Sequence, residues 1–303
     1  MICVDINGGI GNQLFQYASG LAIARKNNTD FCIDISHMDA AYQRSANPIA
    51  IREYALSQFS ISAKPLKTRA VNTKNKICRL INRYQKFIEM GHPLSTKFVF
   101  EKDAWTYDEK LERCGRNAYL CGFFQSWRYF DPYREILMKE FKPQKKYISS
   151  QTENLMEICR SNKWSVGVHI RRGDYKVCQD WLIHESFFLD AIGEMKVLLS
   201  QDIDLFVFCN EPGFAETLLS NEQKIHFVSA EGVFSDFEEF CILSSCANQI
   251  ISNSSFSWWA AYLNQNQEKK VIAPVFNHWK EDYYLPDWMT LSAQSAGYIG
   301  EGR

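Results

Sequence analysis

The sequence predicts an α/β protein built on parallel sheets, and three observations lead to this fold class. Apolar segments without regular polar alternation recur through the second half of the chain, at 165–170, 204–209, 225–228, 249–252 and 271–273. Helical patterns separate these segments, near 185–200, 212–220, 235–247 and 256–264. The chain also opens in the order strand, helix, strand, at 1–6, about 12–27 and 30–35. Strands buried on both faces and separated by helices are typical of a parallel sheet covered on each side.

The length predicts two domains. A chain of 303 residues can form two domains of ordinary size, each with its own core. Polar residues and Pro143 interrupt the apolar pattern at 142–153, so we expect an N-terminal domain at 1–148 and a C-terminal domain at 149–303. An alternative is that the final residues pack back on the first domain. Parallel sheets bind ligands beyond the carboxyl ends of their strands, which is where functional side chains are expected.

Composition and charge exclude several classes of protein. The 34 basic and 35 acidic residues balance, so no global field favours nucleic acid as a partner. Asp5 and Asn7 interrupt the first apolar run, and no segment approaches the roughly 20 apolar residues that span a bilayer. We therefore expect a cytoplasmic protein. Ten cysteines without a C-x-x-C pair, several of them in apolar segments, predict buried free thiols rather than disulfides.

One local segment departs from the balanced charge. Residues 64–86 contain eight basic residues and no acidic one, and apolar residues recur among them at helical spacing. The pattern predicts an amphipathic helix. This helix would either pack its apolar side on its own domain, which we favour, or rest on an anionic membrane surface, as in a peripheral enzyme at the inner membrane.

The densest cluster of charged residues follows the strand at 165–170. His169 is the next-to-last residue of this strand, and Arg171, Arg172 and Asp174 follow shortly after it. Either arginine can grip a phosphate through two parallel charge-assisted hydrogen bonds, and Asp174 is close enough to brace one guanidinium. The alternative is an ordinary surface ion pair. The density of charge at a strand end favours a functional site.

A second cluster follows the strand at 249–252. Asn253, Ser254 and Ser255 stand where the next helix begins, just before Phe256. Free backbone N–H groups and the helix dipole make such an end a natural phosphate site, whereas a single serine there is equally typical of an N-cap. Together with arginines at another strand end, the cluster suggests a diphosphate held between a helix N-terminus and an arginine.

The glycine-rich start, GGIGNQLFQYASG at 8–20, matches a dinucleotide-binding fingerprint only in part. Gly9 and Gly11 supply two glycines, but Leu14 stands where the third is needed, and Asp34 meets the acidic ribose position only ambiguously. A nucleotide-dependent oxidoreductase is therefore the weaker alternative. We expect no metal site, because the histidines lack ligand spacing and the D-x-D at 202–204 precedes its strand.

Four segments together resemble the inverting α1,2-fucosyltransferases of bacterial polysaccharide synthesis. In chain order they are GGIGNQLFQYASG at 8–20, YLCGFFQSWRYF at 119–130, VHIRRGDY at 168–175 and IISNSSFSWWAAYL at 250–263. The third matches the H-x-R-R-x-D motif that these enzymes share with α1,6- and protein O-fucosyltransferases. The resemblance implies a GT-B fold, with two Rossmann-like domains facing a cleft. It also implies metal-independent transfer of fucose, with inversion, from GDP-β-L-fucose to O2 of a galactose, as in O-antigen synthesis.

The resemblance also implies roles for individual residues. Arg171 would contact the β-phosphate and stabilise the departing GDP, and Glu239 would bind the edge of the guanine. Other residues expected to contact the nucleotide are His169, Arg172, Asn253, Ser254, Ser255 and Phe256. No cofactor is expected besides the donor. The acceptor would be a galactose-terminated oligosaccharide or a lipid-linked glycan.

The catalytic base is the least determined residue. The α1,6-type relatives carry a glutamate shortly after the motif, and the corresponding residue here is Gln179, which cannot accept a proton. Asp174 is the first candidate, followed by Asp180, His184 and Glu185. Asn12 matches an asparagine near the reaction centre of protein O-fucosyltransferases, and it would border the fucose and acceptor together with Gln13. The replacement at 179 also leaves open a non-catalytic nucleotide or carbohydrate binder of the same fold.

Overall fold

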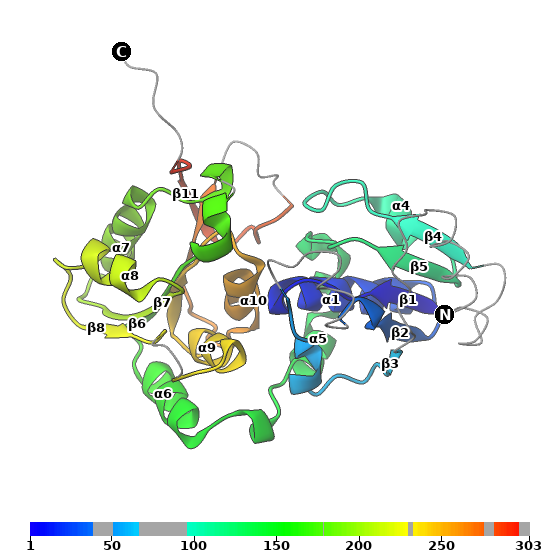
Figure 1. Ribbon diagram of the computed structural model, residues 1–303, viewed down its shortest axis with the longest axis horizontal. Helices are drawn as coiled ribbons and strands as arrows, with labels where there is room; N and C mark the ends of the chain where they lie inside the picture. Colours follow the sequence, from blue (N-terminus) through cyan, green and yellow to red (C-terminus); the bar gives the residue numbers. More distant parts are fainter. Residues whose placement is uncertain (39–50, 67–95, 178, 230–232, 276–281, 297–303) are drawn as a thin grey trace, which may run out of the picture. The chain divides into compact units, whose positions relative to one another are not determined.

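The computed structural model describes residues 1–38, 51–66, 96–177, 179–229, 233–275 and 282–296 (Figure 1). These residues form two compact units. The first contains the described residues up to Lys142, together with Asp282 and Tyr283, and the second contains the described residues from Pro143 to 275 and from 284 to 296. Most of the predicted basic helix at 64–86 lies outside the described residues.

The first unit contains a five-stranded parallel sheet in the order β3-β2-β1-β5-β4. The strands are β1 (Ile2–Asp5), β2 (Phe31–Asp34), β3 (Pro65–Leu66), β4 (Lys97–Phe100) and β5 (Ala118–Cys121). Its helices are α1 (Ile10–Lys26), α4 (Glu109–Glu112) and α5 (Arg134–Glu140), with short 3-10 turns η1 (Ser36–Met38), η2 (Ala55–Gln58), η3 (Trp127–Tyr129) and η4 (Asp131–Tyr133). The predicted opening of strand, helix, strand is confirmed.

The glycine-rich turn between β1 and α1 is fixed by side chains of α1 itself. Gly8 has φ +78°, and a Cβ there would lie only 2.8 Å from Nδ2 of Asn12, so the turn requires glycine. Gln13 is fully buried and binds backbone groups: its amide donates to the carbonyls of Gly8 and Glu53 and accepts from the N–H of Ala55. Gln13 therefore holds the turn in place through backbone contacts.

Residues 282–283 belong to the first unit although they come late in the chain. The Arg128 guanidinium donates to the carboxylate of Asp282 over 3.1 Å, and the Tyr107 N–H donates to the same carboxylate. The ring of Tyr283 stacks on Phe15, with centroids 6.2 Å apart. The last described residues, 284–296, belong to the second unit.

The second unit contains a six-stranded parallel sheet in the order β11-β10-β9-β6-β7-β8. The strands are β6 (Ser165–Ile170), β7 (Asp204–Cys209), β8 (Ile225–Phe227), β9 (Asn248–Ile250), β10 (Val271–Val275) and β11 (Met289–Ser292). The helices are α6 (Ser150–Ser161), α7 (Ser186–Leu199), α8 (Pro212–Leu218), α9 (Asp236–Leu243) and α10 (Ser255–Leu263), with 3-10 turns η5 (Lys145–Tyr147), η6 (Gly173–Val177) and η7 (Gln179–Trp181). All five predicted strands of this half are confirmed.

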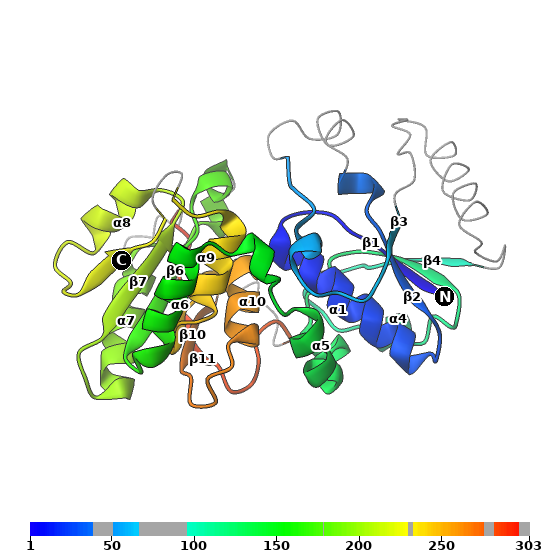
Figure 2. The ribbon, with the colours of Figure 1, turned by 90° about the horizontal axis from the view of Figure 1, so that it is seen from below.

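Helices cover both faces of the second sheet, as the absence of polar alternation predicts. Figure 2 shows α7 and α8 on one face and α6, α9 and α10 on the other. The core under α7 includes Val166 and Val168 from β6 and Leu205 and Val207 from β7, all at most 1% exposed. The eight described cysteines are free thiols, and seven of them are buried, which agrees with the sequence prediction. No helix in the described ranges is long and apolar enough to cross a membrane.

Each sheet has one point where the direction of winding reverses. In the second unit the chain proceeds from β6 to β7 and β8, then returns to place β9 on the other side of β6. In the first unit it proceeds from β1 to β2 and β3, and β5 then pairs with the other side of β1. At such a reversal, the connections that follow the two neighbouring strands pass over opposite faces of the sheet. A crevice therefore opens at the carboxyl ends of these strands. Ligand sites are therefore expected at β6/β9 and at β1/β5.

Candidate active site

His169 lies at the reversal point of the second sheet. Its side chain is 6% exposed, its Nδ1 lies 2.9 Å from Oγ of Ser252 after β9, and its ring packs against Phe256 with centroids 5.1 Å apart. Burial, and secondarily the positive charge of Arg171, lowers the pKa of His169 to about 3. The imidazole is therefore neutral near pH 7 and offers a hydrogen bond rather than a charge.

The two adjacent arginines have different surroundings. The Arg171 guanidinium lies over the Tyr175 ring, 5.6 Å from its centroid. The Arg172 guanidinium lies 3.6 Å from the centroid of the Phe214 ring, and its Nε donates to Glu211 over 3.3 Å. Glu211 also pairs with Lys176 over 2.6 Å, and these two partners lower the pKa of its carboxyl despite the opposing effect of burial. Arg172 is thus held by structural contacts next to α8.

The turn after Arg172 is anchored to the end of β7. The N–H of Arg172 donates to Oδ1 of Asn210, and a Cβ on Gly173 would collide with Nδ2 of the same residue. Gly173 also has φ +30°, so a side chain is excluded there. Asp174 follows in η6, but its side chain and that of Gln179 are outside the described part of the structure. The turn is therefore fixed, and the role predicted for Asp174 is left as a proposal.

The other predicted bases lie in and after η7. Asp180 is exposed. His184 has its Nδ1 2.9 Å from Oγ of Ser186 and accepts from the Ser186 N–H, so its ring serves the start of α7. Glu185 occupies the N-cap position of that helix. His184 and Glu185 thus have local structural positions.

The serine cluster forms the start of α10. Ser254 is the N-cap residue, and its hydroxyl accepts from the N–H of Phe256 over 3.3 Å. Ser255 is the first residue of the helix, and Ser252 is fully buried against His169. The structure thus shows both features that the sequence left as alternatives, an ordinary N-cap and a helix N-terminus beside the end of β6. The N-cap stabilises α10 whether or not a ligand is bound, whereas the helix N-terminus matters for function only when it binds one.

Asn253 lies between these serines and is 3% exposed. Its Nδ2 donates to the backbone carbonyl of Trp181 in η7 over 2.7 Å. Among the described residues, Oδ1 of Asn253 has no hydrogen-bond partner. The amide is therefore oriented by one contact and leaves its oxygen unsatisfied.

Glu239 lies in the first turn of α9, at the other end of the carboxyl edge. Its Oε2 accepts from Oγ of Ser229, and that hydroxyl accepts from the Cys209 N–H at the end of β7. Burial raises the pKa of Glu239 to about 7, more than the bond from Ser229 lowers it. This carboxyl group therefore changes its charge near neutral pH.

Asn12 lies at the reversal point of the first sheet. Its Oδ1 accepts from Nε2 of Gln125 over 2.8 Å, and this bond joins the start of α1 to the segment after β5. Gln125 belongs to YLCGFFQSWRYF at 119–130, one of the four segments that carry the family resemblance. The segment also positions a polar side chain at the candidate site of this unit.

Sequence reasoning missed Glu101, which follows β4. Its carboxylate accepts from the N–H groups of Phe123 and Phe124, over 2.7 and 2.8 Å, and burial raises its pKa to about 7. These bonds hold Phe124 at φ +53°, a conformation that is unusual for a residue with a side chain. No local motif marks Glu101, because its partners are backbone groups 22 and 23 residues away.

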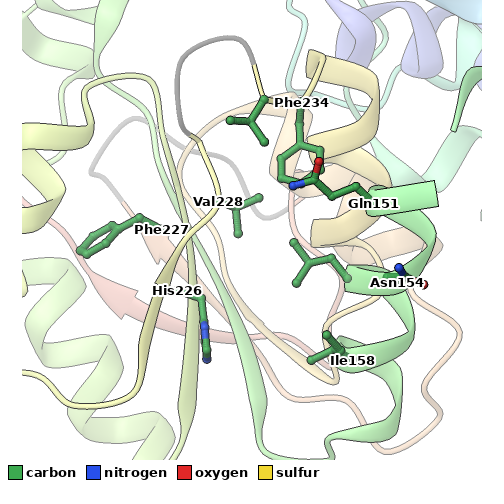
Figure 3. A pocket seen from close by; sticks show the side chains of 9 residues that line it. Gln151, Asn154, Ile158, His226, Phe227, Val228 and Phe234 are labelled. Carbon is green, nitrogen blue, oxygen red and sulfur yellow. The ribbon is translucent and has the colours of Figure 1, made fainter. Parts of the chain in front are cut away.

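A cavity of about 350 Å³ lies elsewhere in the second unit, between α6 and β8 (Figure 3). None of the predicted site residues lines it. Its lining is mainly apolar and consists of Gln151, Asn154, Leu155, Ile158, His226, Phe227, Val228, Val233 and Phe234.

In the described part of the chain, no group of three or more His, Cys, Asp or Glu side chains could hold a metal ion.

Comparison with known proteins gives a family match over most of the chain. Residues 101–292 match the family described as glycosyl transferase family 11. The O-antigen biosynthesis glycosyltransferase WbnK of Escherichia coli is 26% identical over 292 residues, which cover 89% of this chain and 92% of the relative. An alpha-1,2-colitosyltransferase of Escherichia coli is 27% identical over 293 residues, with 91% of each chain covered.

Among solved structures, the chain is similar to the NodZ alpha-1,6-fucosyltransferase of Bradyrhizobium, in crystals soaked with GDP-fucose. The TM-score is 0.52 and the identity 14%, with 86% of this chain and 92% of that chain covered. At this identity the similarity concerns the fold alone. It agrees with the predicted GT-B type of α/β fold with two parallel sheets.

Proposed function

This chain belongs to glycosyl transferase family 11, and from this premise we propose that it transfers L-fucose from GDP-β-L-fucose to O2 of a terminal galactose, with inversion. The family match confirms the resemblance seen in the sequence motifs. The observation that carries the proposal is the junction of His169 with Ser252 at the reversal point of the second sheet. This junction brings the start of α10 and the turn containing Arg171 to one edge of the sheet, which supports a diphosphate site there.

In this proposal the donor lies along the carboxyl edge of the second sheet. The backbone N–H groups at Ser254 and Ser255 and the dipole of α10 receive phosphate oxygens, and Arg171 adds a charged fork. His169 and Phe256 form the neutral wall beneath. Glu239 accepts from the N–H groups of the guanine edge. We assign Arg172 a supporting role, since Glu211 and Phe214 already hold it.

Catalysis in this scheme depends on charge that develops in the transition state. GDP gains negative charge as it departs, while the fucosyl ring becomes cationic. A guanidinium fixed beside the leaving phosphate therefore attracts that phosphate more strongly in the transition state than in the ground state. We propose that Arg171 supplies this stabilisation and that no metal ion is required.

We propose Asp174 as the group that accepts the proton of the acceptor hydroxyl. It stands three residues after Arg171 in the sequence, and an aspartate is a competent general base. Asn12 has a different role in this scheme. An amide is not a base, and its oxygen already accepts from Gln125. Asn12 would orient the acceptor from the first unit.

The proposed acceptor is a galactose-terminated oligosaccharide or a lipid-linked glycan of a surface polysaccharide. Support comes from the similarity to a relative named for O-antigen biosynthesis. The basic segment at 64–86 suits an enzyme that works at the cytoplasmic surface of the membrane. We therefore propose a cytoplasmic protein, with peripheral contact to that surface as the alternative to a basic helix packed on its own domain.

The test is transfer of radiolabelled fucose from GDP-fucose to a panel of β-linked galactosides with different reducing-end sugars. We expect transfer to at least one acceptor, and NMR of the product should show an α1,2 linkage. A parallel titration with GDP and NAD separates the alternatives. Binding of GDP without transfer to any galactoside would favour a non-catalytic binder, and tight binding of NAD alone would favour an oxidoreductase.

A further inference from the structure

The amide of Asn253 is buried, oriented and only half satisfied. Its Nδ2 donates to the Trp181 carbonyl over 2.7 Å, and an amide can make that bond only with its NH2 group turned toward Trp181. The remaining atom, Oδ1, is a hydrogen-bond acceptor. In the described part of the chain no donor reaches it, although the residue is 3% exposed. A buried acceptor without a donor is costly, so Oδ1 of Asn253 calls for a donor that the described residues do not supply.

The chemistry of this atom excludes a phosphate as its partner. Phosphate oxygens at neutral pH are acceptors, and two acceptors do not bond to each other. The partner must carry an O–H or N–H group. In a nucleotide sugar these groups are found on the base, on the ribose and on the transferred sugar, so the place of Asn253 along the edge decides among the three.

Asn253 lies on the opposite side of His169 from the proposed guanine residue. Glu239 is tied through Ser229 to the end of β7, next to the edge strand β8. Asn253 follows β9, on the other side of β6, and is tied to Trp181. The chain after Trp181 leads further away from Glu239, because Ile183 forms a bridge with Ser295, just beyond β11.

This order along the edge matches the order of groups in the donor. The base would lie at Glu239, the ribose between it and His169, and the diphosphate at the start of α10. The transferred sugar then extends past the diphosphate, to the side of Asn253 and Trp181. Resting on the function proposed above, we infer that Oδ1 of Asn253 accepts a hydrogen bond from a ring hydroxyl of the donor's fucosyl group. Asn253 is thus a donor-specificity residue, and its contribution is absent when GDP binds without the sugar.

The inference is tested by calorimetric titration of the full chain with GDP-fucose and with GDP. For Asn253→Ala we expect the affinity for GDP-fucose to fall about tenfold, the usual effect of losing one buried hydrogen bond, while the affinity for GDP changes less than about twofold. Equal loss for both ligands would assign Asn253 to the ribose or the phosphates and overturn the inference. So would unchanged affinity for both.

The matched control is Asn264, the buried amide at the other end of α10. It is 6% exposed and donates through Nδ2 to the Cys246 carbonyl over 2.8 Å, far from the carboxyl edge in sequence and topology. Asn264→Ala removes an equivalent buried amide, so it should destabilise the unit while keeping the ratio of the two affinities. If Asn264→Ala also changed the ratio of the affinities for GDP-fucose and GDP, that ratio would reflect lost stability rather than a lost contact.

Donors that lack a single hydroxyl identify the contact. GDP-linked 2-deoxy, 3-deoxy and 4-deoxy fucose are titrated into the wild type and Asn253→Ala, with GDP-colitose as the 3-deoxy donor. For one of them the two proteins should bind equally, because the missing hydroxyl has already removed the bond. A tenfold difference with all three would overturn the inference. Failure of the wild type to bind either GDP-fucose or GDP would instead contradict the proposed function.

Discussion

Nδ1 of His169 lies 2.9 Å from Oγ of Ser252, and this contact joins the carboxyl ends of β6 and β9. These strands are neighbours in the sheet but are separated by 83 residues of sequence. The contact therefore exists only in the folded unit. It brings the H-x-R-R-x-D segment and the start of α10 together at the carboxyl edge of the second sheet, where they form the candidate site.

Arg171→Lys is expected to lower turnover by about 100-fold or more while the protein stays folded and binds GDP. A lysine keeps the charge but loses the planar fork that holds a phosphate through two bonds. Steady-state kinetics with GDP-fucose measures the effect. Arg172→Lys serves as the contrast, since Arg172 contacts Glu211 and Phe214, and it should lower thermal stability more than turnover. Near-normal turnover in Arg171→Lys would remove Arg171 from the mechanism.

GDP is expected to bind more tightly as the pH rises through 7. The pKa of Glu239 is raised to about 7, and only the ionised carboxylate accepts from the guanine N–H groups. If the ionised form alone binds, the affinity should increase roughly tenfold between pH 6 and pH 8. Calorimetry across this range measures it. Glu239→Gln should bind weakly with a flat profile, and a wild-type profile that is also flat would exclude this carboxyl from base recognition.

His169 is expected to make the protein less stable in acid. Its pKa is lowered to about 3, so below about pH 6.5 the unfolded chain takes up a proton that the folded chain does not. The stabilisation is present above pH 6.5 and declines toward pH 3. The buried Glu101 and Glu239 have raised pKa values and act in the opposite direction. The measurement therefore compares the pH dependence of the free energy of unfolding in the wild type and in His169→Gln. Urea unfolding of the variant should show a shallower loss of stability in acid than the wild type.

Two glycines are expected to respond to alanine in opposite directions. A Cβ on Gly122 would collide with the Cβ of Glu101, whereas no atom lies within 4 Å of a Cβ built on Gly193 in α7. Gly122→Ala should lower the free energy of unfolding by about 1–3 kcal/mol. Gly193→Ala should raise it by about 0.5–1 kcal/mol, because alanine favours the helix. Chemical denaturation tests both, and equal effects would show that Glu101 yields to the added methyl group.

Activity is expected to persist in EDTA. The proposed stabilisation of the leaving GDP comes from Arg171 and backbone N–H groups, which need no divalent ion. Initial rates before and after extensive chelation measure this. Complete loss of activity, restored by Mn²⁺, would require a metal in the mechanism.

Four of the five strands predicted in the second half are almost fully buried, whereas β8 is mostly exposed. The strand Ser165–Ile170 is buried at every position, so its sequence shows no regular alternation of polar and apolar residues. Strand β11 was not predicted, because it lies at the edge of the sheet and alternates between exposed and half-buried residues. Four residues is the shortest run over which a period of two indicates a strand, so the signal from β11 is weak.

The candidate site was predicted only in part for a different reason. Arg171 and Arg172 are adjacent and chemically identical, so sequence alone cannot separate their roles. The separation comes from Glu211 and Phe214, about 40 residues later in the chain, which hold Arg172. Glu101 was missed for the same reason, since burial and distant backbone partners define its role.

The placement of residues 282–283 has a consequence for domain shuffling. Exchange of the second unit with that of a relative, for example to change donor choice, cannot succeed cleanly with one crossover near Pro143. Such a hybrid would import foreign residues against Arg128 and Phe15, the native partners of Asp282 and Tyr283. A hybrid designed with three junctions, which returns these two residues to their own unit, preserves both cores.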